Sequence, residues 1–340
     1  MGSRECATRR PRAGQGLPRC RPLRTGGGAS PLIFDLATAL VAFAIAVATY
    51  PVLIRVFRRL KLGQPVQAEL SEAHQRKAGT PTGGGILFMG LALIGGLISL
   101  TTHRGAVPAT LALVLFGGLG LMDDLRKLRV GAAGYPARVK FPLQVLLAIP
   151  VAVVAQAPQH FLPEQLSWLY WPLAVGALVG AANAVNLSDG LDGLAGGLAV
   201  IALLGVSLGL PGAAAGEKAV AMTLVGGVLA FLVYNRHPAR VFMGDTGALG
   251  LGAALAAMAI QQGWVLLLPL LGLVFVIETL SVMIQLAFFK VTGGRRIFKG
   301  TPIHLTFQQE GWSENRIALT FWSAGAVAAF LSSWIARALA

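Results

Sequence analysis

Residues Asn183-Ala-Val-Asn186-Leu-Ser-Asp189-Gly-Leu-Asp192-Gly-Leu-Ala-Gly-Gly197 place two amides and two carboxylates inside an apolar sequence. An isolated charge at the centre of a bilayer costs roughly 2.5 kcal/mol or more, so these groups need partners. Asp189 and Asp192 are three residues apart and would share a face on a helical turn. The surrounding glycines allow a ligand or metal to approach the backbone closely. We therefore expect the floor of a polar site at a membrane surface; the alternative is that both aspartates cap the next helix.

The composition around this stretch is that of a multi-span membrane protein. The 340 residues are 55% hydrophobic and 12% charged, whereas soluble domains are about 25% charged. Both cysteines, Cys6 and Cys20, lie in the first 30 residues, so the apolar part has no disulfide framework or thiolate metal site. The net charge of +14 would suit nucleic acid. In membrane proteins, however, basic residues mark cytoplasmic connections, and we expect no nucleic-acid partner.

Two parts of the chain differ in composition. Residues 1–30 hold seven arginines, one acid and many Gly and Pro without apolar periodicity, and we expect them to form a disordered basic tail. Beyond it, apolar segments long enough to cross a membrane, about 20 residues each, recur to the C-terminus. The first, Ile33–Val56, is too long for the core of a signal peptide and should remain as a span. Residues 31–340 are expected to form one all-α transmembrane domain with polar loops at the cytoplasmic surface.

The predicted domain is a polytopic integral membrane protein with about ten transmembrane helices. The predicted spans are Ile33–Val56, Gly84–Leu100, Ala106–Met122, Phe141–Ala157, Trp168–Ala182, Leu194–Leu210, Ala219–Tyr234, Thr246–Ile260, Trp264–Phe289 and Ile317–Ala336. Lys and Arg gather in the odd-numbered connections, whereas the even-numbered ones hold only Arg104 and Lys218. The positive-inside rule then puts the odd connections in the cytoplasm. Because the number of spans is even, both termini lie outside, and the basic tail violates the rule.

Five aspartates fall at the cytoplasmic ends of these spans: Asp123, Asp124, Asp189, Asp192 and Asp245. The adjacent pair Asp123 and Asp124 offers oxygen ligands for a hard cation such as Mg²⁺. Lys127 is placed to neutralise one acid or to hold a phosphate; the alternative is a solvated helix end with an ion pair three residues apart. Asp245 lies between glycines before an apolar span and also suits a helix N-cap.

Two further connections carry candidate polar groups. The first cytoplasmic connection ends in Lys77-Ala-Gly-Thr80-Pro-Thr82-Gly-Gly-Gly85, a glycine-rich turn that opens a helix. Such a turn presents free N–H groups to a phosphate, although it also suits tight packing of small residues. The last connection, Lys290–Arg316, is long and basic and contains His304, a residue able to donate to a phosphate or to move a proton.

Glu278 lies in the middle of the ninth predicted span. A carboxyl group buried there without a role is costly. A structural hydrogen bond between helices and a part in catalysis are both open for this residue.

At these residues the chain resembles the polyprenyl-phosphate N-acetylhexosamine-1-phosphate transferase superfamily and, within it, the phospho-N-acetylmuramoyl-pentapeptide-transferase family. The resemblance runs from about Glu72 to Trp322. The motifs that carry it are Lys77-Ala-Gly-Thr-Pro-Thr82, Asp123-Asp124, Asn183 to Gly193, Tyr234-Asn235 with His237-Pro238, Phe242-Met-Gly-Asp245, Glu278-Thr-Leu-Ser281, and Arg296-Ile-Phe-Lys299 with Thr301-Pro-Ile-His304.

The resemblance implies a Mg²⁺-dependent phosphotransferase of the bacterial inner membrane, multi-pass, with its active site facing the cytoplasm and a possible homodimer. Undecaprenyl phosphate would attack the β-phosphate of UDP-N-acetylmuramoyl-pentapeptide and give lipid I and UMP. We favour direct attack with Asp123 as base; a covalent phospho-enzyme is the open alternative. A sister enzyme that transfers N-acetylglucosamine-1-phosphate to a polyprenyl phosphate and an ion-coupled transporter are the rival functions.

The expected site residues follow from these motifs. The catalytic set is Asp123, Asp124, Asp245 and His304, and the metal ligands are Asp245 and Asp189. The substrate-binding set is Lys77, Thr82, Lys127, Lys140, Asn183, Asn186, Asp189, Asp192, Asn235, Phe242 and Gln285. The chain departs from the family at Leu305 and Thr306, where histidines are expected after His304, and at Ala248, where a serine is expected.

Overall fold

The computed structural model describes residues 31–60, 63, 79–130, 134–160 and 162–340. Within these ranges the chain is helical and forms no β-strand; a single isolated bridge joins Gly63 to Pro81. The predicted tail at residues 1–30 and the predicted substrate-binding residue Lys77 lie outside the described residues.

The longer helices follow the predicted spans in order and in approximate position. The longer helices are α1 (Pro31–Arg59), α3 (Gly85–Leu100), α4 (Val107–Val130), α5 (Ala137–Val154), α6 (Tyr170–Ser188), α7 (Leu194–Leu204, continued by a π-turn at Gly205–Gly209), α8 (Ala215–Asn235), α9 (Gly244–Gln261), α11 (Leu273–Val291) and α13 (Glu314–Leu339). Among the described residues, seven helices are long and apolar enough to cross a membrane. The chain is therefore an all-α polytopic membrane protein, while the number of spans and the side of the termini remain predictions.

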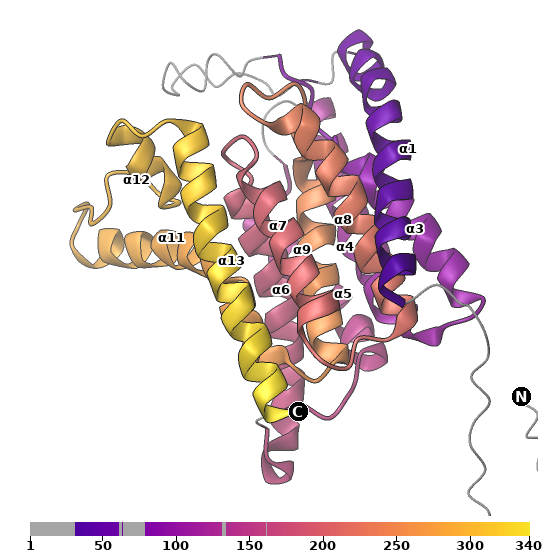
Figure 1. Cartoon of the computed structure of the whole chain (residues 1–340). Coiled ribbons are helices and arrows are strands. Elements are labelled where there is room, and N and C mark those ends of the chain that lie inside the picture. The colour runs from indigo at the N-terminus through magenta and orange to yellow at the C-terminus, as the bar shows by residue number, and fades with distance from the viewer. Residues whose placement is uncertain (1–30, 61–62, 64–78, 131–133, 161) are drawn as a thin grey trace, which may run out of the picture.

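Helix α9 lies at the centre of the bundle (Figure 1). All of its residues from Asp245 to Ile260 are buried, and α3, α4 and α6 pack against it. Small residues make this possible: a Cβ at Gly120 of α4 would lie 2.2 Å from the carbonyl oxygen of Asp245, and one at Gly252 would lie 2.3 Å from that of Ala181. Close backbone approach and van der Waals packing hold helices together where lipid supplies no hydrophobic driving force.

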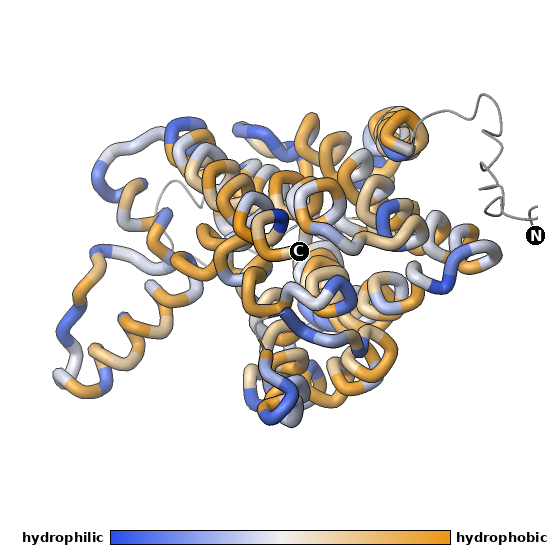
Figure 2. Tube along the Cα trace, turned by 60° about the horizontal axis from the view of Figure 1, so that its bottom comes forward, coloured by the Kyte–Doolittle hydropathy of each residue, from blue (hydrophilic) through white to orange (hydrophobic). Residues whose placement is uncertain are grey.

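The outer helices present apolar side chains to the surroundings. Phe34 and Leu40 of α1 are 66% and 67% exposed, and Phe330 and Trp334 of α13 are 69% and 63% exposed. Figure 2 shows hydrophobic residues along the outward faces of the helices and hydrophilic ones mostly at their ends. A soluble protein rarely exposes apolar surface of this extent, so these faces are suited to lipid.

The ninth predicted span is wrong as a single helix from Trp264 to Phe289. After a short turn at Val265–Leu267, α10 (Leu268–Leu271) ends at Gly272, whose φ and ψ of −102° and 31° are not helical, and α11 begins at Leu273. Figure 1 shows α11 leaving the bundle in a direction that crosses that of α13. Apolar periodicity does not reveal such a break, because the segments on both sides of it are equally apolar.

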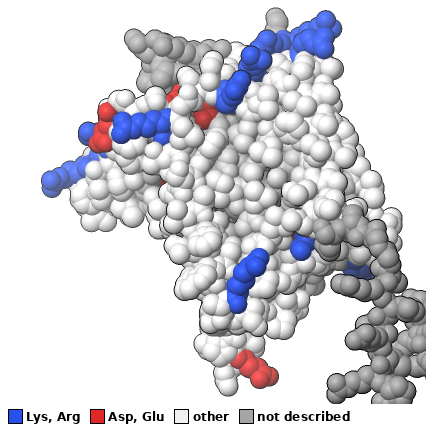
Figure 3. Space-filling view, in the orientation of Figure 1, with Lys and Arg blue, Asp and Glu red and all other residues white. Residues whose placement is uncertain are grey.

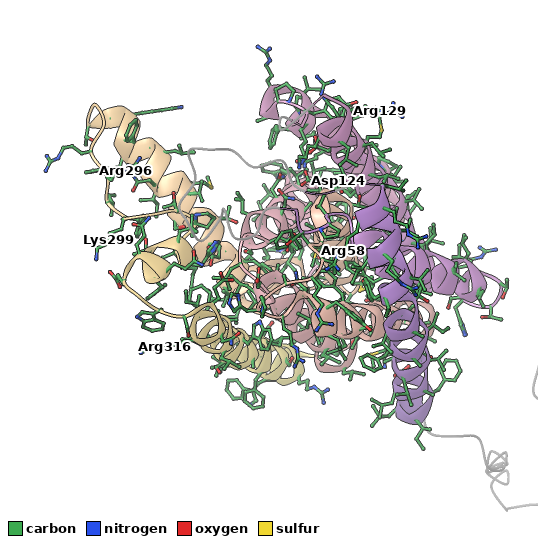
Figure 4. All side chains as sticks on the ribbon, turned by 90° about the horizontal axis from the view of Figure 1, so that it is seen from above. Arg58, Asp124, Arg129, Arg296, Lys299 and Arg316 are labelled. Atoms are coloured by element: carbon green, nitrogen blue, oxygen red, sulfur yellow. The ribbon has the colours of Figure 1, made fainter. Side chains whose placement is uncertain are left out.

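One end of the bundle collects the charged residues. Figure 3 shows Lys and Arg along the upper edge, and Figure 4 looks onto that end with Arg58, Asp124, Arg129, Arg296, Lys299 and Arg316 labelled. The short helix α12 (His304–Gln309) lies beside α13 at this end. These residues come from the odd-numbered connections, so the fold brings the predicted cytoplasmic connections together at one surface.

The close contact between α4 and α9 gives a first prediction. Gly120→Ala places a methyl group against the backbone of Asp245, and overpacking of this kind costs about 1–3 kcal/mol. The unfolding midpoint of the detergent-purified protein, followed by intrinsic fluorescence, should fall.

The matched control is Gly118→Ala on the same helix, because a Cβ there meets nothing within 4 Å. Alanine favours a helix over glycine by about 1 kcal/mol, so this variant should keep or raise the midpoint. Equal midpoints for the two variants would show that the backbones of α4 and α9 are not in close contact.

Candidate active site

The carboxylate of Asp124 joins the end of α4 to the start of α9. Its Oδ1 accepts a hydrogen bond from the N–H of Asp245 at 3.0 Å, and its Oδ2 accepts from the N–H and hydroxyl of Thr246 at 2.9 and 2.7 Å. First-turn N–H groups have no partner within a helix, and α9 has no side-chain cap at its own N-cap residue. Gly244 has a φ of 77°, and a Cβ there would lie 2.8 Å from Asp124 Oδ2, so the turn requires glycine.

Asp123 points to a different set of partners, since adjacent residues on a helix do not face the same way. Its Oδ1 accepts from the N–H of Tyr135 at 2.6 Å. Its Oδ2 lies 3.0 Å from Lys127 Nζ and 3.4 Å from Lys140 Nζ. Lys127 thus neutralises the acid four residues earlier, whereas the alternative, an ion pair with Asp124 at a spacing of three, does not form among the described residues.

Asp245 completes a group of two carboxylates and two ammonium groups. Lys127 Nζ lies 2.8 Å from Asp245 Oδ1, and Asn186 Nδ2 donates to the same oxygen at 3.2 Å. Lys140 Nζ donates to Asp245 Oδ2. We refer to Asp123, Lys127, Lys140 and Asp245 as the carboxylate–lysine cluster.

The formal charges of the carboxylate–lysine cluster cancel. The Asp123 and Asp245 side chains are only 2% and 11% exposed, whereas Lys127 keeps 34% of its side-chain surface exposed. A buried charge that loses its partner typically costs 3–5 kcal/mol, so the lysines hold the carboxylates in place. The exposed ammonium surface can still receive a further anion. This combination suits a phosphate that arrives from outside.

The two aspartates of the Asn183–Gly197 motif do not share a helical face. α6 ends at Ser188 and α7 begins at Leu194, and Gly193 has a φ of 77°, so residues 189–193 form a tight connection. Asp189 occupies the C-cap position of α6, and Asp192 turns toward the connection between α8 and α9. The predicted shared face is therefore wrong, because residues 189–193 form a tight connection with a left-handed glycine and not a helical turn.

Asp192 meets two groups from distant parts of the chain. Its Oδ2 accepts from the N–H of Ala239 at 3.0 Å and lies 3.1 Å from His237 Nδ1. Glu314 Oε2 lies 3.5 Å from the same nitrogen and accepts from the N–H of Asp192 at 3.3 Å. The three side chains offer ligand atoms within 4.8 Å of one another, an arrangement that accommodates a metal ion or a proton on His237. Sequence reasoning missed Glu314, because Ser313-Glu314 is typical of a plain helix start.

The predicted amides hold the elements of the site together. Asn183 Nδ2 donates to Gln144 Oε1 of α5 at 2.6 Å. Asn235 Oδ1 accepts from the N–H of Gly193 at 2.9 Å, and its Nδ2 donates to the carbonyl oxygen of Val241 at 2.9 Å. Asn235 thereby fixes residues 189–193 against the connection between α8 and α9.

The glycine-rich start of α3 lies against the residues that precede α9. The N–H groups of Gly84 and Gly85 donate to the carbonyl oxygens of Phe242 and Met243, both at 2.8 Å. These two N–H groups are therefore used within the protein, and the predicted phosphate-binding turn is wrong for them. Tight packing of small residues, the alternative reading, is what the structure shows.

The substrate-binding residues predicted near this turn are only partly placed. Thr82 is half-buried, and the N–H of Phe242 donates to the carbonyl oxygen of neighbouring Pro81 at 2.8 Å. Thr82 and Phe242 thus lie on paired segments beside Asp245.

The basic connection after α11 is tied back to that helix. Gln285 Oε1 accepts from the N–H groups of Ile297 and Phe298, both at 3.0 Å. The Thr306 hydroxyl donates to the carbonyl oxygen of Gly300 at 2.6 Å and accepts from its N–H at 3.2 Å. Thr306, one of the departures from the family pattern, therefore has a structural function in this loop.

His304 is the deeply buried member of the last connection. It is 1% exposed, and its Nδ1 lies 3.0 Å from Glu278 Oε2. The neighbouring Leu305 is half-buried, and Ala248, where a serine was expected, is fully buried in α9. Of the two possibilities left open for Glu278, the structure shows the hydrogen bond between elements.

An apolar groove runs between α6 and the broken pair α10 and α11. It has a volume of about 360 Å³, and its lining includes Gly176 and Gly180 of α6, Pro269 of α10, and Phe275 and Leu280 of α11. A Cβ at either glycine would meet nothing within 4 Å, so these residues keep the groove open. The lining also includes residues 184 and 185, one turn before the polar connection 189–193.

Comparison with known proteins gives a consistent result. Residues 106–263 match the family described as Glycosyl transferase family 4. The chain is 41% identical to phospho-N-acetylmuramoyl-pentapeptide-transferase of Heliobacterium modesticaldum over 309 residues, which cover 87% of this chain and 96% of the relative. It is 42% identical to the proteins of that name from Bacillus thuringiensis and Bacillus cereus over 315 residues, which cover 88% of this chain and 97% of each relative.

The cap on α9 gives a second prediction. In Asp124→Asn one carboxylate oxygen becomes an NH₂ group, which cannot accept the hydrogen bonds that Asp245 and Thr246 donate, and the remaining oxygen is a weaker acceptor. A buried donor left unsatisfied costs about 1–3 kcal/mol. The unfolding midpoint in detergent should fall clearly. Glu310→Gln, the same change at a 40% exposed acid paired with Lys299, should alter stability by less than about 1 kcal/mol. An unchanged midpoint for Asp124→Asn would mean that α9 does not depend on this cap.

Proposed function

The chain belongs to the phospho-N-acetylmuramoyl-pentapeptide-transferase family and is a membrane phosphotransferase, and from this we propose that it transfers phospho-N-acetylmuramoyl-pentapeptide from the UDP-linked donor to undecaprenyl phosphate. The products are lipid I and UMP, in peptidoglycan synthesis. The observation that carries the proposal is the carboxylate–lysine cluster near one end of an apolar groove. A lipid phosphate and a soluble nucleotide can meet at such a boundary.

The two lysines supply what phosphoryl transfer needs most, namely positioning and stabilisation of negative charge. Lys127 and Lys140 each contact both Asp123 and Asp245. They are thereby fixed from several directions, and preorganised charge is worth more than charge that must reorganise during the reaction. Phosphate oxygens bind to the ammonium surface that remains exposed.

The reaction proceeds by direct attack in this proposal. A phosphate oxygen of undecaprenyl phosphate forms a bond to the β-phosphorus of the donor, and the bond from that phosphorus to the bridging oxygen breaks. UMP leaves with the electron pair. A phosphate monoester is mostly ionised at neutral pH because its second pKa is about 6, so Asp123 has at most one residual proton to accept.

Asp124 has a different task from the other predicted catalytic aspartates. Among the described residues, its carboxylate accepts hydrogen bonds only from Asp245 and Thr246, the first residues of α9 after Gly244. We assign it the positioning of Asp245, through which it affects the reaction.

Mg²⁺ is the proposed cofactor, with Asp245 and Asp189 as its protein ligands. Carboxylate oxygens are the ligands that Mg²⁺ prefers, usually together with substrate phosphates. Two observations support this donor set. Asp245 is a buried carboxylate that accepts a hydrogen bond from Asn186, and Asn186 precedes Asp189 by three residues at the end of α6. The lysines already balance the cluster, so the ion is needed when phosphates add negative charge. Once bound it would stabilise charge on the transferring phosphate.

The apolar groove is proposed to hold the polyprenyl chain. Its lining is apolar apart from Thr279, and it lies between helices whose outer faces carry exposed hydrophobic residues. Residues 184 and 185 place one end close to Asn186, which contacts Asp245. A chain lying there would bring its phosphate toward the cluster.

The donor nucleotide and sugar are proposed to lie on the charged end, over residues 189–193. The substrate-binding residues assigned there are Lys77, Thr82, Asn183, Asn186, Asp189, Asp192, Asn235, Phe242 and Gln285. Because Asn235 and Gln285 bind backbone groups, we propose that they act by shaping the pocket.

The proposed location is the bacterial inner membrane, with the charged end in the cytoplasm, where a UDP-linked donor is available. Both termini then lie outside, and a homodimer is expected from the family resemblance alone. The supporting observation is the gathering of Lys and Arg at one end of the bundle (Figure 3).

The test of the proposed function is UMP release by the detergent-purified protein with Mg²⁺ and undecaprenyl phosphate. UDP-N-acetylmuramoyl-pentapeptide and UDP-N-acetylglucosamine are offered separately, and we expect turnover of the first alone. Turnover of the second alone would assign the protein to the N-acetylglucosamine-1-phosphate transferases. Without lipid acceptor no UMP should appear; a stoichiometric burst would contradict direct attack. If neither donor reacts with a folded preparation, the proposed function fails, and ion-coupled uptake into proteoliposomes should be measured.

The assignment of Asp245 gives a third prediction. Asp245→Asn removes the charge that contacts both lysines and the proposed metal, so Mg²⁺-dependent turnover should fall by at least about 100-fold. The variant should remain folded and monodisperse in gel filtration, although its unfolding midpoint should fall because the two lysines lose one of their two carboxylate partners. Retained activity in a folded preparation would remove Asp245 from the metal site.

The assignment of the groove gives a fourth prediction. Gly180→Leu fills the groove without a clash, because a Cβ there meets nothing within 4 Å. The KM for undecaprenyl phosphate should rise several-fold, while the KM for the nucleotide donor stays the same. Gly90→Leu on α3 is the control, since its Cβ position is equally open but lies outside the groove. An unchanged lipid KM in Gly180→Leu would place the prenyl chain elsewhere.

A further inference from the structure

Glu278 and His304 form a buried pair outside the carboxylate–lysine cluster. The carboxyl group comes from α11 and the imidazole from the start of α12, and the two side chains are 0% and 1% exposed. Glu278 Oε2 lies 3.0 Å from His304 Nδ1. Glu278 Oε1 is buried and has no hydrogen-bond partner among the described residues. The protonation of this carboxyl group is therefore coupled to that of His304.

The charge of the pair limits where its protons lie. A Glu278 carboxylate beside a neutral His304 would leave one uncompensated buried charge, which is costly. Two neutral arrangements avoid this cost: a carboxylate with an imidazolium, or a protonated carboxyl group that donates to Nδ1 of a neutral imidazole. In both arrangements the other ring nitrogen, Nε2, carries a hydrogen. Glu278 thus makes Nε2 of His304 a donor.

That donor faces the polar connection between α6 and α7. A Cβ at Gly190 would lie 3.1 Å from His304 Nε2, so the ring edge is directed at the backbone immediately after Asp189. A side chain at position 190 would crowd this edge of the ring. Gly190 belongs to residues 189–193, over which we place the donor substrate, so Nε2 lies on the donor side of the site.

We propose that Glu278 is a positioning residue which holds His304 with its Nε2–H directed over Gly190, toward the diphosphate of the nucleotide donor. The inference rests on the proposed function for the identity of the anion. The buried carboxyl group orients the ring and keeps its outer nitrogen protonated, and His304 makes the contact with substrate. Glu278 touches no reacting atom.

The test is a double-mutant cycle of Glu278→Gln, His304→Gln and the double variant, measured as UMP release. Partners that act through one another are not additive. Glu278→Gln should lower kcat by about 10- to 100-fold, the range found when the hydrogen-bond partner of a metal-bound histidine is removed. In the His304→Gln background the same change should have little further effect. Additive losses, or activity of Glu278→Gln within twofold of the wild type, would overturn the proposal.

A matched variant separates positioning from loss of packing. Ser281→Ala alters a buried side chain one turn along α11, whose hydroxyl donates to the backbone carbonyl of Glu278 at 2.6 Å. It should keep kcat within about twofold, as expected for a small local perturbation. A loss equal to that of Glu278→Gln would assign the effect to the helix and overturn the proposal.

A measurement that needs no turnover completes the test. Nitrogen–proton NMR of protein labelled with nitrogen-15 histidine, with the His304 signal assigned by its loss in His304→Gln, reports which ring nitrogen carries hydrogen. The proposal requires a protonated Nε2 in the wild type. A bare Nε2 would overturn it even in a fully active enzyme. If instead the wild type releases no UMP from any donor, the proposed function fails while this result still decides the state of the pair.

Discussion

The mutual neutralisation of two buried aspartates and two lysines is the interaction on which the rest of the structure depends. Asp123 and Lys127 come from α4, Lys140 from α5 and Asp245 from α9. The end of α4 and the starts of α5 and α9 must lie at the same depth in the bundle for these charges to meet. Removing any one of the four charged side chains leaves another without its partner. The small residues of α9 and the Asp124 cap serve this requirement, because they bring the start of α9 against the end of α4.

The break at Gly272 has a related consequence for the lipid substrate. Because α11 turns away from the bundle, an apolar groove opens beside α6. The same helix brings Glu278 within hydrogen-bond distance of His304. One irregularity in the chain thus separates a region suited to a prenyl chain from a polar region suited to a nucleotide. The Thr306 and Gln285 contacts hold the last connection over that junction without the later histidines expected of the family.

Apolar periodicity predicted the position of nearly every helix, since a span must be about 20 residues long whatever its neighbours are. It also placed Asp123, Lys127 and Asp245 at one surface. It failed at two turns: Asp189 and Asp192 do not share a face in the tight connection 189–193, and the chain turns at Gly272 inside the ninth predicted span. Partners distant in sequence were beyond its reach, so neither Glu314 beside Asp192 nor the capping of α9 by Asp124 was predicted.

The central claim is that the carboxylate–lysine cluster is neutral by itself and takes up a divalent cation together with substrate phosphates. The most direct test is a titration with Mn²⁺ in place of Mg²⁺, followed by electron paramagnetic resonance. It is performed on the purified protein with and without the UDP-linked donor, with donor alone as the blank. The account predicts weak binding without donor, much tighter binding with it, and loss of that gain in Asp245→Asn. Tight binding by the substrate-free protein that Asp245→Asn leaves unchanged would contradict it.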